Sequence, residues 1–240
     1  MKATDATMKA EMKKFDDREA LAGNLAEAVA KKLSAAIEKD GDASLAVSGG
    51  STPKMFFEKL SQAKLDWSKV TVTLVDDRMV PPDHERSNER LAYEHLLRNE
   101  AITAKFVPLW SDLSDHVDTL AEHAATSIAH IERPFDVVIL GMGTDGHTAS
   151  FFPEGNNLHA AIDPDGNATV ISMLAPGAGE PRLTITLPRL IEADMLVLHI
   201  EGEEKLSVLE KAREGGPEED MPIRAVLSNA SRPVTVYWAP

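Results

Sequence analysis

The segment FDVVILGMGTDGHTAS, residues 135–150, places an acid and a histidine among closely spaced glycines. The glycines are Gly141, Gly143 and Gly146. A histidine can act as a general base near neutral pH, because its unperturbed pKa lies close to that pH. Glycine accepts positive φ and allows close backbone approach, so this turn can hold Asp145 and His147 in a fixed, crowded geometry. We expect His147 to transfer protons, with Asp145 either orienting its ring or capping the turn; a purely structural histidine is the alternative.

A second polar turn follows the strand pattern at residues 44–47. Its residues are Ser48, Gly49, Gly50, Ser51 and Thr52. Pro53 comes next, at the expected first position of a helix. Backbone N–H groups at a helix N-terminus attract anions, so this turn is a candidate phosphate-binding site. An ordinary Ser/Thr helix cap is the alternative interpretation.

A cation follows the next strand pattern, in the segment LVDDRMVPPDHERSNERLAYEHLL at residues 74–97. Arg78 stands just past the strand, ahead of a proline-containing loop. A planar guanidinium can bind a phosphate or carboxylate through two parallel hydrogen bonds. The alternative is a surface ion pair with Asp76 or Asp77.

The chain alternates short strand patterns with helical patterns. Strands are predicted at 44–47, 70–75, 104–109, 135–140, 168–173, 183–187, 195–200 and 233–238. Helices are predicted at 17–39, 53–63, 87–99, 112–131, 203–213 and 222–229. Strands separated by helices imply parallel crossovers, and continuously apolar strands indicate burial on both faces. We therefore expect an α/β fold with a doubly wound, mostly parallel sheet flanked by helices.

The predicted sheet also locates the site. Ligands of such sheets gather beyond the carboxyl ends of the strands, which is where these polar segments occur. No repeat, low-complexity tract or charged linker divides the 240 residues, and EGGPEED at 214–220 is typical of a surface loop. We expect a single domain over residues 1–240.

The glycine spacing at 141–146 also matches half of a dinucleotide-binding fingerprint, GxGxxG after a strand. The other half is missing. Pro153, Gly155 and two asparagines interrupt any long helix, while Asp163 and Asp165 precede a strand instead of ending one. No segment matches GxxxxGK[ST]. A nicotinamide, flavin or P-loop site is not predicted.

Composition narrows the class of partner. The formal net charge of −14 disfavours nucleic acid, which is bound by clustered Lys and Arg. The absence of cysteine excludes disulfides, thiolate metal sites and cysteine nucleophiles, and it fits a reducing cytosol. The opening MKATDATMKAEMKKFDDREA has no apolar signal region, and no segment is apolar enough to span a membrane. We expect a cytoplasmic protein with no nucleic-acid or membrane partner.

Five segments, in this order along the chain, resemble the 6-phosphogluconolactonase family of the oxidative pentose phosphate pathway. They are the SGGSTP turn, the VDDR segment, GMGTDGHTASFFP, PRLTITLPRL (181–190) and HIEGEEK (199–205). The resemblance extends over most of the chain. It implies the fold shared with glucosamine-6-phosphate deaminase and ribose-5-phosphate isomerase. It also implies metal-independent, cofactor-free hydrolysis of a sugar-phosphate lactone, 6-phosphoglucono-δ-lactone, to 6-phosphogluconate.

The resemblance assigns roles to individual residues. His147 matches the catalytic histidine, Arg78 and the SGGSTP turn match substrate- and phosphate-binding positions, and Arg182 falls in a segment that lines the site. Lys205 matches the lysine of a GxxK motif; without the resemblance it would be read as a helix-surface lysine. The family usually has Asp-Glu-Arg where this chain has Asp76, Asp77 and Arg78. That departure puts any role of the longer glutamate in doubt.

Two other functions remain as alternatives. One is a deaminase or isomerase acting on a sugar phosphate, although the run TASFFPEGNNL after the histidine favours the lactonase. The other is a non-catalytic sugar-phosphate sensor, which would normally carry a DNA-binding module that is not evident here. His116, His123 and His130 recur every seven residues, and two helical turns span about 10.5 Å, too far for neighbours to share one metal ion. No metal site is predicted.

Overall fold

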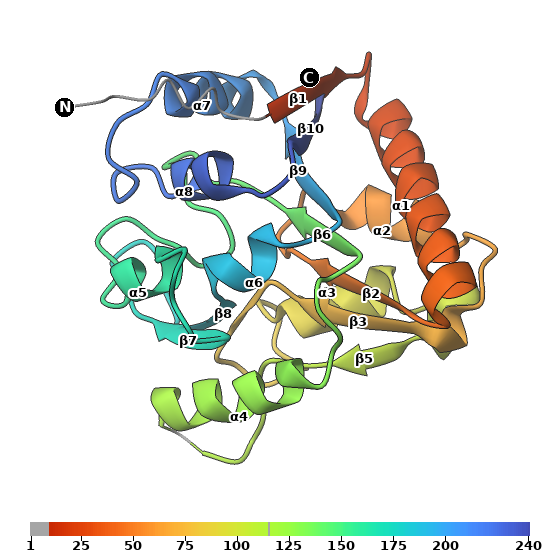
Figure 1. Cartoon of the computed structure of the whole chain (residues 1–240), viewed down its shortest axis with the longest axis horizontal. Helices are drawn as coiled ribbons and strands as arrows, with labels where there is room; N and C mark the ends of the chain where they lie inside the picture. The colour runs from red at the N-terminus through yellow and green to blue at the C-terminus, as the bar shows by residue number, and fades with distance from the viewer. Residues whose placement is uncertain (1–9, 115) are drawn as a thin grey trace.

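A seven-stranded parallel sheet forms the centre of the computed structural model, which describes residues 10–114 and 116–240 (Figure 1). The strand order is β1-β10-β9-β6-β2-β3-β5. The strands are β1 (Ala10–Lys14), β10 (Val234–Ala239), β9 (Met195–Glu201), β6 (Val137–Leu140), β2 (Ala43–Val47), β3 (Val70–Leu74) and β5 (Lys105–Val107). The predicted parallel α/β architecture is confirmed. The prediction that the first 20 residues contain no signal region falls partly on residues 1–9, which lie outside the described residues.

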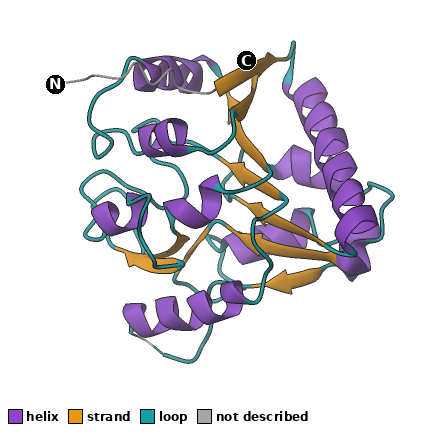
Figure 2. Cartoon of the chain, in the orientation of Figure 1, coloured by secondary structure: helices purple, strands orange, loops and turns teal. Residues whose placement is uncertain are grey.

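Helices cover both faces of this sheet, as a doubly wound fold requires (Figure 2). On one side lie α1 (Arg18–Asp40), α2 (Lys54–Leu60) and α3 (Asn88–His95), and on the other α6 (Leu187–Ile191), α7 (Glu203–Arg213) and α8 (Ile223–Asn229). The predicted apolar stripe of α1 is buried, for example at Leu25 and Val29. Asp17 caps the start of this helix, because its carboxylate accepts a hydrogen bond from the N–H of Ala20 at 2.8 Å.

The hydrophobic core is centred on the strands β2 and β6 in the middle of the main sheet. Every residue of β2 and β6 is buried, which matches the continuous apolar runs of the sequence. The apolar cluster continues from these strands into the helices and the second sheet described below. This continuity supports the proposal that the chain folds as a single domain.

A separate three-stranded antiparallel sheet was not predicted. It consists of β4 (Asp76–Arg78), β8 (Arg182–Ile185) and β7 (Val170–Met173), with α4 (Val117–Ala129) packed against it. The sequence predicts β7 and β8 as strands but assigns them to the main sheet. Strand patterns report local burial and alternation, and the choice of partner strand depends on contacts distant in sequence.

The elements that the sequence missed are β1, β4, α5 (Leu158–Ile162) and α6, together with the short 3₁₀ helices at Trp67–Lys69 and Asn99–Thr103. β1 is an edge strand with mostly exposed or half-buried residues, and β4 is three residues long. The two missed α-helices are five residues long, so they span little more than one turn. Elements this short have no measurable hydrophobic period.

Among the described residues, no helix is both long enough and apolar enough to cross a membrane.

Candidate active site

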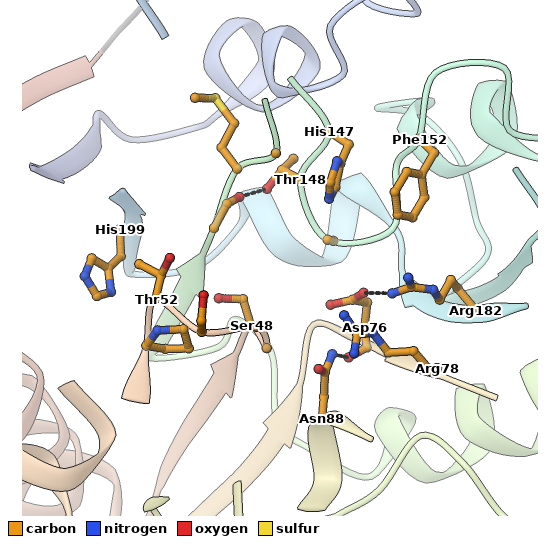
Figure 3. A pocket seen from close by; sticks show the side chains of 18 of the residues that line it. Ser48, Thr52, Asp76, Arg78, Asn88, His147, Thr148, Phe152, Arg182 and His199 are labelled. Carbon is orange, nitrogen blue, oxygen red and sulfur yellow. Dashed lines mark hydrogen bonds and ion pairs between the residues drawn. The ribbon is translucent and has the colours of Figure 1, made fainter. Parts of the chain in front are cut away.

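A cavity of about 290 Å³ opens at the carboxyl ends of β2, β6 and β9 (Figure 3). Most of the site residues expected from the sequence and the resemblance line it. They are Ser48, Gly49, Gly50, Ser51, Thr52, Arg78, His147, Arg182 and Lys205. Asp145 does not line the cavity and lies behind the histidine instead. The carboxyl ends of parallel strands meet at one edge of the sheet, which is why segments far apart in sequence converge here.

Asp145 holds the imidazole of His147. Its Oδ1 lies 2.5 Å from the ring Nδ1 and also accepts a hydrogen bond from the backbone N–H of His147 at 3.0 Å. An ionised carboxylate only accepts hydrogen bonds, so Nδ1 carries the proton and Nε2 keeps a free lone pair. Burial opposes ionisation of Asp145, but the hydrogen bonds from His147, and the positive charge of its ring once Nε2 is protonated, outweigh it and hold the pKa of this carboxyl below its usual value. Nε2 is therefore available as a base.

The glycine turn is shaped by the histidine and aspartate that it carries. A Cβ on Gly143 would lie 2.1 Å from His147 Nδ1 and 2.4 Å from Asp145 Oδ1, so only glycine permits this packing. After Gly141 the chain runs through turns and an isolated bridge between Thr148 and Phe151, and the next helix, α5, begins only at Leu158. A dinucleotide fingerprint instead places its phosphates at the N-terminus of a helix that the glycine turn itself opens.

The SGGSTP turn forms another wall of the cavity. A Cβ on Gly49 would lie 1.8 Å from Asn88 Oδ1, so the turn packs directly against the start of α3. Asn88 is itself fixed, because its Nδ2 donates to the carbonyl of Asp76 at 2.9 Å. In the ranges 10–114 and 116–240, the side-chain hydroxyls of Ser48, Ser51 and Thr52 make no hydrogen bond to the protein. These hydroxyls are free to bind a ligand.

Arg78 and Arg182 face each other across the β4–β8 ladder. Arg182 is buried, with its NH1 3.7 Å from Asp76 Oδ2, and its NH2 donates to the carbonyl of Ala178 at 2.5 Å. Burial lowers the pKa of Arg182, and the negative charge of Asp76 partly offsets this effect. Arg78 donates from NH1 to the carbonyl of Arg86, and its buried Nε has no partner among the described residues. Two guanidinium groups thus converge at one side of the cavity.

Lys205 supplies a third cation. It lies in the first turn of α7, and its Nζ donates to the carbonyl of Met142, just before Gly143. Burial lowers the pKa of Lys205, while the charges of Asp145 and Glu204 oppose this shift. Over the part of the chain that the structure describes, no carboxylate lies within ion-pair distance of this ammonium. Its charge is therefore available to an anionic ligand.

Comparison with known proteins identifies the family. Residues 16–238 match the family described as glucosamine-6-phosphate isomerases/6-phosphogluconolactonase. A 6-phosphogluconolactonase of Rhizobium meliloti (strain 1021) is 54% identical over 97% of this chain and 100% of its own length. One from Pseudomonas aeruginosa is 42% identical over 91% of this chain and 90% of its own. The chain belongs to this family.

A solved structure agrees with this assignment. The crystal structure of a 6-phosphogluconolactonase from Shewanella baltica superposes with a TM-score of 0.94 at 41% identity, covering 98% of this chain and 99% of that chain. The chain is an enzyme of the 6-phosphogluconolactonase type. The more distant enzyme from Trypanosoma brucei, at 22% identity and a TM-score of 0.81, shares the fold.

The departure from the family pattern at Asp77 has a structural explanation. Asp77 is fully buried, and its Oδ1 accepts from the N–H groups of Arg78 at 2.7 Å and Asn88 at 2.8 Å. Its Oδ2 accepts from the N–H of Glu89 at 3.3 Å. Asp77 thus binds N–H groups at the N-terminus of α3 that have no partner within the helix, and it does not line the cavity. In this lactonase-family enzyme, residue 77 connects Arg78 to the helix that supports the SGGSTP turn.

This buried carboxyl predicts a pH-dependent stability. Burial raises the pKa of Asp77 from 3.8 to about 7, despite the backbone hydrogen bonds that favour the charged form. The folded state therefore binds this proton more tightly than the unfolded chain. The stability that Asp77 contributes is fully present below about pH 4 and is lost as the pH rises to about 7. Asp77→Asn, which keeps an accepting oxygen without an ionisable group, should lack this loss.

Between about pH 4 and pH 7, the free energy of unfolding of the wild type should fall relative to that of Asp77→Asn by up to about 1.4 kcal/mol for each pH unit. Above about pH 7 the difference should be constant. Urea unfolding of both proteins across the window measures it. If the free energies of unfolding of the two proteins had the same pH dependence, the raised pKa of Asp77 would be contradicted.

Several residues that line the lactonase-family cavity were not predicted. They are Asp76, Asn88, Thr148, Phe152 and His199. Asp76 is not on the surface, where an ion pair with Arg78 would place it; it is buried and accepts from Ser150 Oγ at 2.6 Å. His199 is buried in β9, and its Nε2 lies 3.3 Å from Glu201 Oε1. Phe152 and His199 lie in the segments GMGTDGHTASFFP and HIEGEEK that carry the resemblance, but neither residue type by itself indicates a catalytic or binding role.

Proposed function

We propose that this enzyme hydrolyses 6-phosphoglucono-δ-lactone to 6-phosphogluconate, with His147 as the general base. The observation that carries the proposal is the hydrogen bond from Nδ1 to Asp145, which leaves the lone pair of Nε2 free beside a cavity with three cationic side chains. A free imidazole nitrogen suits proton abstraction from water. Cations suit a substrate that carries a phosphate and develops an oxyanion during reaction.

The reaction needs no covalent enzyme intermediate, because a δ-lactone is an activated ester. Water attacks the C1 carbonyl carbon as Nε2 of His147 takes one of its protons. The C1 oxygen becomes an oxyanion, and the carbonyl then reforms as the bond from C1 to the ring oxygen breaks. The imidazolium returns its proton to the departing ring oxygen. Asp145 stays ionised throughout and stabilises the transient positive charge on the ring.

The cations divide between two tasks in this proposal. The 6-phosphate binds to the SGGSTP turn, Arg78 and Lys205, which fixes C1 over His147 and converts binding energy into orientation. The close packing of Gly49 against Asn88, which is hydrogen-bonded to Asp76, supports a shared site for the turn and Arg78. Arg182 supports the oxyanion, since its guanidinium is buried and rigidly held.

The proposal is tested by following ring opening of 6-phosphoglucono-δ-lactone by NMR with and without enzyme. The uncatalysed reaction supplies the reference rate. We expect the enzyme to accelerate ring opening and to release no ammonia from glucosamine 6-phosphate. Ammonia release without acceleration of lactone opening would instead support the deaminase alternative.

A further inference from the structure

Phe152 stacks on the proposed base. The ring centroids of Phe152 and His147 are 4.3 Å apart, and the ring planes differ by 28°. Arg182 contacts the same aromatic ring, with its Cζ 5.3 Å from the centroid. Figure 3 shows Phe152 beside His147, with the guanidinium of Arg182 near it. The histidine is therefore held both by a carboxylate and by an aromatic ring.

The two contacts restrain different motions. The hydrogen bond to Asp145 restrains one edge of the imidazole, at Nδ1. An offset aromatic stack fixes the plane. Among the described residues Nε2 makes no hydrogen bond, so its direction depends on how firmly these two contacts hold the ring. Displacements of about 1 Å at a reacting group can reduce a rate by about 10²-fold.

Phe152 is itself rigidly placed. Its side chain is buried, its N–H donates to the carbonyl of Ser150 at 3.1 Å, and its carbonyl accepts from Gly155 at 3.0 Å. Arg182, on the same ring, is fixed by Asp76 and by the carbonyl of Ala178. Ser150 Oγ donates to the same Asp76. The aromatic ring is thus anchored through both its own loop and the second sheet.

We propose that Phe152 is a positioning residue, whose ring holds the imidazole of His147 in the plane that directs Nε2 at the water that attacks C1 of the lactone. The role rests on the proposed function of His147. Phe152 moves no proton and forms no bond to the substrate in this role. Its loss should therefore lower kcat and leave substrate binding nearly unchanged.

The adjacent residue provides a matched control. Phe151 is also a buried phenylalanine of the same apolar core, but unlike Phe152 it does not line the cavity. Phe151→Leu and Phe152→Leu remove the same atoms from neighbouring positions. A general loss of packing should affect both variants, whereas loss of the stack should affect only the second.

We expect Phe152→Leu to reduce kcat for 6-phosphogluconolactone by about 10- to 100-fold with KM within about twofold of wild type. Phe152→Met, which fills similar volume without a planar face, should show the same defect, and Phe152→Tyr should restore most of kcat. Phe151→Leu should keep near-normal kcat while losing thermal stability. Equal kcat for the two leucine variants, or a defect confined to KM, would overturn the proposal.

A second measurement separates this proposal from the function itself. In protein with ¹⁵N-labelled histidine, the Nδ1–H proton of His147 should give a sharp NMR signal in the wild type and in Phe151→Leu, and a broadened one in Phe152→Leu. If the wild type failed to open the lactone but kept this pattern, the proposed function would fail and the positioning would stand. A sharp, unshifted signal in Phe152→Leu would reject the positioning role alone.

Discussion

His147→Ala is expected to lower kcat for 6-phosphogluconolactone by about 10²- to 10⁴-fold, the range usual for a positioned acid–base group. The variant lacks the nitrogen that takes the proton from water, while the phosphate-binding groups remain. Binding of 6-phosphogluconate, measured by calorimetry, should stay close to that of the wild type. The rate must be corrected for spontaneous ring opening.

His159→Ala provides the control for this experiment. His159 is largely exposed and lies 3.8 Å from Glu219, away from the cavity lining. Its replacement should leave kcat unchanged. Near-normal turnover of His147→Ala would reject the general-base assignment. A loss of product binding as large as the loss of rate would point to a structural histidine.

Lys205→Met is expected to raise KM for 6-phosphogluconolactone on the order of 10²-fold, because it removes a charge-assisted contact to phosphate from a partly buried site. The methionine keeps much of the apolar stem. Unphosphorylated gluconolactone lacks the group that Lys205 is proposed to bind. The kcat/KM for that poorer substrate should therefore change little, and steady-state kinetics with both lactones measures the difference.

Lys211→Met, an exposed change on the same helix, should have no effect on either lactone. An equal loss on both lactones would show that Lys205 does not bind the phosphate. The same pair of substrates applied to Arg78→Ala tests whether this arginine, which the resemblance assigns to phosphate, contributes alongside Lys205. We expect its loss also to fall mainly on the phosphorylated lactone.

Much of the active site was predictable because its residues follow strands. His147, Arg78 and the SGGSTP turn each come directly after an apolar strand pattern, and parallel strands bring their carboxyl ends together. The resemblance added Arg182 and Lys205, and without it Lys205 would be read as a helix-surface lysine. The two arginines were placed in the same site, but nothing in the sequence indicated that they would face each other across β4 and β8.

The structural role of Asp77 could not be predicted from its position in a motif. In the sequence it is the residue where this chain departs from the family's usual glutamate. In the structure it accepts hydrogen bonds at the N-terminus of α3. Its partners lie eleven and twelve residues along the chain, beyond a loop whose path no local pattern specifies.

The sequence by itself determined the parallel α/β sheet and the polar turns at its edge, since these depend on periodicity and on contacts a few residues apart. It left open whether Asp145 orients the ring of His147 or caps the turn. Only the tertiary structure decided the second sheet, the Asp76–Arg182 contact and the stack of Phe152 on His147 under Arg182. The physical reason is the sequence separation of the interacting residues. Turn geometry and strand burial depend on neighbouring residues. The orientation of a side chain in a cavity is set by packing between segments that meet only when the chain has folded.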